Sequence, residues 1–183
     1  VKKKGKEDMS KTVPVSELYG SGELERQKAR YRKAIEDYKS YFGGIGDGFR
    51  LFSAPGRTEV GGNHTDHNHG KVLAAGVNMD VIAVVEPIEV PKIALKSEGY
   101  EESIIEINDL EVKESEKNTA DALIRGVVAG FKKSGYQVGG FKAYTTTNVL
   151  KGSGLSSSAA FEVLVGNILS ALYNNGGIGA IKI

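Results

Sequence analysis

The alternation of apolar and polar positions predicts a long amphipathic helix near the start of the chain. Large apolar side chains recur at helical spacing between residues 24 and 42, and Gly43 follows the last of them. Ser21 is a candidate N-cap, and Glu23 and Glu25 place negative charge in the first turn, where the helix dipole favours it. We expect the apolar stripe to face the core. It consists of Leu24, Tyr31, Ile35, Tyr38 and Phe42.

Shorter apolar runs after this helix predict strands. The first, Phe49–Ala54, is expected to stop at Pro55, because proline cannot donate a hydrogen bond to a strand ladder. Residues 56–70 are dense in glycine and polar side chains, so we expect a loop there rather than a core element. The remaining predicted strands are Val77–Glu86, Lys92–Ser97, Ile104–Ile107 and Val138–Thr147.

Two further helices complete the pattern. Asn118 or Thr119 can cap a helix that runs to Lys133, and an apolar helix follows residue 156. Gly126 and Gly130 lie four residues apart, which predicts a close approach of the helix backbone to a neighbouring element. Helix, several strands, helix, strand and helix, with few crossovers, favours the α+β class.

Composition narrows the function classes. The 183 residues suggest one domain, and the formal net charge of +1 gives no case for a nucleic-acid or membrane partner. The absence of cysteine excludes disulfides and thiolate zinc sites and fits a reducing, cytoplasmic location. No apolar run approaches the roughly 20 residues of a membrane span. The chain lacks an initial methionine and stops at AIKI, so we interpret it as a fragment of a longer protein.

The segment KGSGLSSS, residues 151–158, has the features of a phosphate-binding loop. It lies between a β-branched strand and an apolar helix, so backbone N–H groups free of Cβ atoms meet the positive end of a helix dipole. Hydroxyls of Ser156, Ser157 and Ser158 can bind phosphate oxygens or a magnesium ion. A flexible linker is the alternative, but linkers have polar flanks. The order of residues fits neither a Walker A loop nor a dinucleotide-binding GxGxxG motif.

All three histidines of the chain lie between residues 64 and 69, with Asp66 among them. The cluster admits three interpretations: a zinc or iron site, a solvated loop, or recognition of a sugar by Asn63, His64 and Asp66. Arg57, shortly before it, can stabilise charge on a transferring phosphoryl group or form a surface ion pair. A phosphate loop, a polyol-binding cluster and a placed arginine together indicate phosphoryl transfer to a small hydroxyl substrate.

Two motifs resemble those of a known family. GRTEVGGNHTDHNHG is similar to the sugar-binding motif of galactokinases, and KGSGLSSSAAFEV is similar to the ATP loop of the GHMP small-molecule kinases to which galactokinases belong. The resemblance implies an N-terminal domain like domain 2 of ribosomal protein S5, with a mixed or antiparallel sheet packed against helices. It places this domain at residues 21–183, after a flexible segment at residues 1–20 that includes the start of the leading helix region. The C-terminal domain is absent from the chain.

The resemblance also implies a reaction and its residues. Family members transfer the γ-phosphoryl group of ATP, with Mg²⁺, to the C1 hydroxyl of galactose. Arg57 would stabilise the transition state, Ser158 would meet the magnesium ion, and Ser97 lies near a position that touches nucleotide in relatives. The sugar would be lined by Asn63, His64, Thr65 and Asp66. The ATP phosphates would be wrapped by Gly152, Ser153, Gly154, Leu155, Ser156, Ser157 and Ser158.

Some positions depart from the family pattern. Glu59 replaces the usual asparagine, and Asn63 replaces an acidic residue, which removes an ionic acceptor at the sugar. Asn148 and Leu150 replace the Asp and Pro of the usual lead-in to the ATP loop. These differences leave open a kinase for another sugar, a galactose- and ATP-binding sensor without catalysis, and a plain structural domain.

The family's catalytic aspartate follows the ATP loop by more residues than the chain contains. We therefore expect the fragment alone to lack kinase activity. Apolar surface that the missing C-terminal domain would cover is expected to favour self-association.

Overall fold

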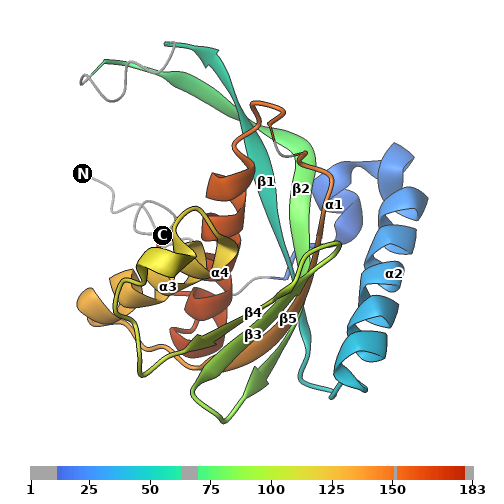
Figure 1. Cartoon of the computed structure of the whole chain (residues 1–183). Coiled ribbons are helices and arrows are strands. Elements are labelled where there is room, and N and C mark those ends of the chain that lie inside the picture. Colours follow the sequence, from blue (N-terminus) through green and yellow to red (C-terminus); the bar gives the residue numbers. More distant parts are fainter. Residues whose placement is uncertain (1–11, 63–69, 151, 180–183) are drawn as a thin grey trace, which may run out of the picture.

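The computed structural model describes residues 12–62, 70–150 and 152–179, which form a five-stranded sheet with helices on both faces (Figure 1). Helix α2 (Leu24–Phe42) covers one face, and α3 (Ala120–Lys133) and α4 (Ser157–Tyr173) cover the other. No helix in the described ranges combines the length and apolarity that crossing a membrane requires.

The sheet has the strand order β1-β2-β5-β3-β4, which places the last strand in the sequence at its centre. All neighbouring strands are antiparallel except β3 and β5, which are parallel. The predicted α+β class and the mixed sheet are therefore confirmed. The strands are β1 (Arg50–Gly61), β2 (Leu73–Ile88), β3 (Lys92–Ser97), β4 (Glu102–Glu106) and β5 (Gly140–Thr147).

Strand β2 is apolar on both sides because it divides two cores. Ile82 and Val84 point towards α2, where they meet Tyr31 and Tyr38, which are buried as the predicted stripe requires. The alternate residues of β2 point to the other face, since side chains along a strand alternate between its two sides. There, Val81, Ala83 and Val85 belong to the core that α3 and α4 complete.

The ends of α2 agree only in part with the sequence. Gly43 ends the helix in a left-handed conformation with φ of 79°, and its N–H donates to Lys39 O, as its position predicts. The predicted cap at Ser21 is wrong. Ser21 begins a short 3₁₀ turn (Ser21–Glu23), and Glu23 takes the N-cap position without a capping side-chain bond. A five-residue helix that the pattern does not predict, α1 (Val15–Tyr19), precedes this turn.

The prediction that the first strand stops at Pro55 is also wrong. Strand β1 continues to Gly61, and Pro55 pairs with Asp80. Proline is tolerated because β1 is an edge strand, and the register shifts between Pro55 and Arg57. As a result, residues 56–61 belong to the sheet rather than to a loop, and β1 and β2 extend as a long hairpin (Figure 1).

Helix α3 starts as predicted, because the side chain of Thr119 accepts a hydrogen bond from Ala122 N–H. The prediction of a close backbone approach at Gly126 and Gly130 is wrong. Both residues are exposed, and a Cβ atom built at either one would meet nothing within 4 Å. The buried side of α3 is formed instead by larger residues, namely Ile124, Arg125, Val128 and Phe131.

Candidate functional site

The loop that follows β5 has left-handed backbone at every second residue. The φ angles are 80° at Gly152, 74° at Gly154 and 57° at Ser156. Glycine adopts such angles without a Cβ clash, whereas serine rarely does. Alternation of this kind turns successive N–H groups towards one side and forms an anion-binding concavity. The loop is braced from within, since Ser153 N–H and Oγ bond to Leu150 O at 3.2 and 2.7 Å.

The loop leads into the N-terminus of α4. The N-cap residue, Ser156, makes no capping side-chain hydrogen bond, and the first turn contains no acidic residue. The amide groups of this turn therefore lack the usual internal acceptor, and the helix dipole adds positive potential. Gly152, Gly154 and Ser158 are exposed, so the concavity and the Ser158 hydroxyl are open to a ligand. Phosphate chemistry fits these groups.

Strand β1 contacts this loop directly. Arg57 N–H donates to Leu155 O at 3.0 Å. Next to it, Gly56 is buried, and a Cβ atom there would lie 3.0 Å from Leu155 O and 3.2 Å from the methyl groups of Val149. Glycine thus permits a close approach of the two segments. The exposed Arg57 side chain makes no ion pair within the described ranges, so its charge is available near the loop.

Ser97 ends β3 beside β5. Its hydroxyl shares a hydrogen bond of 2.8 Å with Thr145 Oγ1, and Glu98 N–H donates to Thr145 O at 2.9 Å. Because β3 and β5 are parallel, Ser97 lies at the sheet edge from which the phosphate loop leaves. A contact of Ser97 with nucleotide stays a prediction.

The predicted sugar-binding residues Asn63, His64, Thr65 and Asp66 lie outside the described residues. The described strands that flank them, β1 and β2, remain paired as far as Gly61 and Leu73. The zinc interpretation falls on the same segment, and within the described ranges no group of three or more potential metal ligands gathers.

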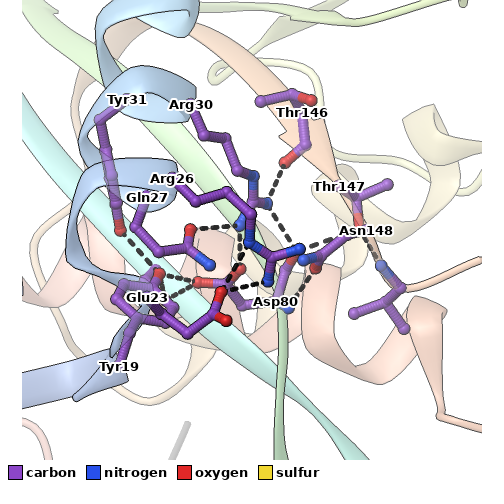
Figure 2. Close-up of polar contacts among 12 residues, drawn as sticks. Tyr19, Glu23, Arg26, Gln27, Arg30, Tyr31, Asp80, Thr146, Thr147 and Asn148 are labelled. Carbon is purple, nitrogen blue, oxygen red and sulfur yellow. Dashed lines mark hydrogen bonds and ion pairs between the residues drawn. The ribbon is translucent and has the colours of Figure 1, made fainter. Parts of the chain in front are cut away.

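A buried polar network that the sequence did not reveal lies beneath the site (Figure 2). Asp80 on β2 is only 2% exposed. Arg30 of α2 donates to its carboxylate Oδ1 at 2.5 Å and to its backbone carbonyl at 2.9 Å. Ser53 Oγ donates to Oδ2 at 2.5 Å, and the Tyr19 hydroxyl donates to the same oxygen. An acidic residue within the apolar run VNMDVIAVVE is the signal that could have indicated a buried partner.

The tyrosines of this network remain protonated donors. Burial raises the pKa of the Tyr19 phenol, and the hydrogen bond to Asp80 raises it further. Burial likewise raises the pKa of Tyr31, whose hydroxyl lies 3.0 Å from that of Tyr19. The Asp80 carboxylate is therefore surrounded by donors, which is the condition under which a buried charge is tolerated.

Gly154→Ala in the full-length protein is expected to weaken ATP binding by about five- to thirtyfold, because a left-handed φ costs a residue with a Cβ atom about 1–2 kcal/mol. The loop would relax when free and would have to regain its shape on binding. Calorimetric titration with ATP measures the effect. Gly48→Ala is a matched control, since Gly48 is exposed, has no positive φ and has open space around its Cβ position. Equal ATP affinity in both variants would contradict a role for the loop conformation.

Two family models match the chain. The galactokinase galactose-binding signature matches residues 36–87, and the GHMP kinases N terminal domain matches residues 122–179. The first match includes β1 with Arg57, and the second includes the phosphate loop and α4.

Similar curated proteins are galactokinases. The chain is 38% identical over 125 residues to the galactokinase of Thermococcus kodakarensis, an alignment that covers 68% of this chain and 34% of that protein. It is 30% identical over 158 residues to the galactokinase of Clostridium tetani, covering 85% of this chain and 40% of that protein. The chain thus spans well under half the length of these relatives.

Solved structures agree with these matches. Lactococcus lactis galactokinase complexed with galactose superposes with a TM-score of 0.76 at 27% identity, covering 83% of this chain and 39% of that chain. Methanococcus jannaschii mevalonate kinase superposes with a TM-score of 0.58 at 13% identity, covering 72% of this chain and 42% of that chain, a similarity of fold alone. The fold implied by the sequence motifs is confirmed.

Proposed function

The chain belongs to the GHMP kinase family, on its galactokinase branch, and we propose that the full-length protein phosphorylates galactose at its C1 hydroxyl with ATP as the donor. The observation that carries the proposal is the 3.0 Å hydrogen bond from Arg57 N–H to Leu155 O. It joins the strand that leads to the sugar motif to the loop suited to phosphate. A cytoplasmic location is part of the proposal.

The nucleotide half of the proposal rests on the loop and on α4. Backbone N–H groups of Gly152–Ser158 would hold the ATP phosphates, helped by the dipole of α4. A magnesium ion, when bound, neutralises phosphate charge, and the exposed hydroxyl of Ser158 is the group that would hold it. Ser97 would contact the nucleotide from the end of β3.

The sugar half rests on the motif that follows β1. Asn63, His64, Thr65 and Asp66 would orient the hexose through donors and acceptors at fixed angles. Arg57 would stabilise the charge that develops on the phosphoryl group during transfer, since a guanidinium is a fixed cation that can contact two oxygens at once. Positioning and electrostatics would supply most of the rate acceleration.

A second candidate is a GHMP kinase for another sugar. Glu59 and Asn63 favour it, because they differ from the residues usual at these positions and change the donors and acceptors offered to hydroxyl groups. A coupled ADP-release assay of the full-length protein against a panel of hexoses separates the two candidates. A clear preference for another hexose would reject galactose, and sugar binding without turnover would indicate a sensor.

Asp66→Ala tests the assignment of the sugar motif in the full-length protein. We expect galactose affinity to fall by about tenfold or more, because one charge-assisted hydrogen bond contributes about 1.5–3 kcal/mol, whereas ATP affinity should stay within about twofold. Calorimetry with each ligand separately measures both values. A loss of ATP affinity with unchanged galactose affinity would contradict the assignment.

A further inference from the structure

The junction between β2 and β5 is built differently from a simple strand end. The paired registers of the two strands stop at Val81 and Thr147. One residue further on, Asn148 N–H donates to Asp80 O at 3.2 Å, and Asp80 N–H donates to the side-chain Oδ1 of Asn148 at 2.7 Å. The side-chain amide thus takes the place of a backbone acceptor and extends the ladder by one step as the chain turns away.

The opposite side of this junction is fixed from α2. Arg30 reaches the Asp80 carboxylate and carbonyl and also donates to Thr146 O at 3.4 Å (Figure 2). The side chains of Arg30 and Asp80 are only 17% and 3% exposed. Because an ion pair shielded from water has a well-defined geometry, it holds the end of β5 against β2.

The residue after Asn148 carries this constraint to the functional loop. Val149 N–H donates to Thr147 Oγ1 at 3.0 Å, and Thr147 Oγ1 donates to Asp80 O at 3.3 Å. The buried Val149 side chain lies against Gly56, next to Arg57. A shift of Asn148 therefore moves Val149, and with it both the start of the phosphate loop and the strand that carries Arg57.

We propose that Asn148, held by Asp80 and Arg30, is a positioning residue that sets the phosphate loop for nucleotide. The inference rests on the proposed function for the identity of the ligand, ATP. Asn148 does not need to touch ATP. Its side chain acts by fixing the point at which the chain leaves the sheet, five residues before the left-handed Gly154 and Ser156 complete the turn into α4.

Asn148→Ala and Asn148→Asp in the full-length protein form a matched pair, because a carboxylate oxygen can accept the Asp80 N–H bond and a methyl group cannot. For Asn148→Ala, we expect KM for ATP and calorimetric Kd for ADP to rise about five- to fiftyfold, as leaving a buried donor unpaired predicts. KM for the sugar should stay within about twofold. Asn148→Asp should keep both nucleotide values within about threefold of the parent.

A second pair guards against misfolding of the first. Thr147→Val removes the hydroxyl that bonds Asp80 and Val149, whereas Thr147→Ser keeps it. We expect the valine variant to weaken ADP binding and the serine variant to retain it. Unchanged ADP affinity in both Asn148→Ala and Thr147→Val would overturn the inference, as would an equal loss of nucleotide and sugar affinity, which a merely structural role produces. If the parent binds ADP but phosphorylates no sugar, the proposed function fails, while the comparison of ADP affinities still decides the inference.

Discussion

Arg57→Ala in the full-length protein is expected to lower kcat by about 100- to 1,000-fold, the cost of removing one group that stabilises transition-state charge. KM for ATP and for the sugar should change far less, because the interaction is stronger in the transition state than in the ground state. Steady-state kinetics with each substrate varied in turn separates the two effects. The backbone bond from Arg57 N–H to Leu155 O is retained in the variant, so the loop should keep its place.

Two variants control this experiment. Arg57→Lys keeps the charge but not the planar, forked donors, and we expect it to recover part of kcat. Arg32→Ala removes an exposed arginine from α2 and should leave both parameters within about twofold, as for most surface substitutions. An Arg57→Ala effect confined to KM would instead assign the arginine to ground-state binding.

Arg30→Met is expected to reduce the free energy of unfolding by about 3–5 kcal/mol, because it leaves the buried Asp80 carboxylate without its counter-charge. The hydrogen bonds from Ser53 and Tyr19 remain, but neither group carries a positive charge. Urea denaturation of the full-length protein, followed through the unfolding of this domain, measures the change.

Lys33→Met is the matched control on the same helix. Lys33 is 63% exposed and pairs with Asp37 and Glu98 at the surface, so its loss should cost at most about 1 kcal/mol. The double variant Arg30→Met, Asp80→Asn should recover part of the stability, since no charge is then buried alone. Similar losses for Arg30→Met and Lys33→Met would show that the Arg30–Asp80 pair does not stabilise the fold.

The elements with strong periodicity could be predicted from the sequence alone. Strand β3 has the predicted bounds, and α3 begins after the predicted cap, Thr119. The errors have physical causes. An interior proline stops a central strand, but the position of β1 at the sheet edge is a tertiary fact that its own residues do not state. Helix α1 is only five residues long, too short for a periodic signal.

The candidate site divides in the same way. The loop and its glycines follow from local sequence, because their backbone angles depend on residues 152–156 themselves. The network around Asp80 does not, since its members are brought together from α1, α2, β1, β2 and the end of β5. Arg30 and Thr146, which share a hydrogen bond, are 116 residues apart. Only the acidic residue within an apolar strand marked the place where a partner was needed.

The central position of β5 has a consequence for biosynthesis. Strands β2 and β3 both pair with β5, which is made about fifty residues after β3, so each keeps an unsatisfied edge while α3 is being translated. Open edges of this kind attract other nascent chains. Ribosomal pausing or truncation before residue 140 should therefore leave a polypeptide that depends on chaperones, whereas release of residue 147 allows the sheet to close in one step.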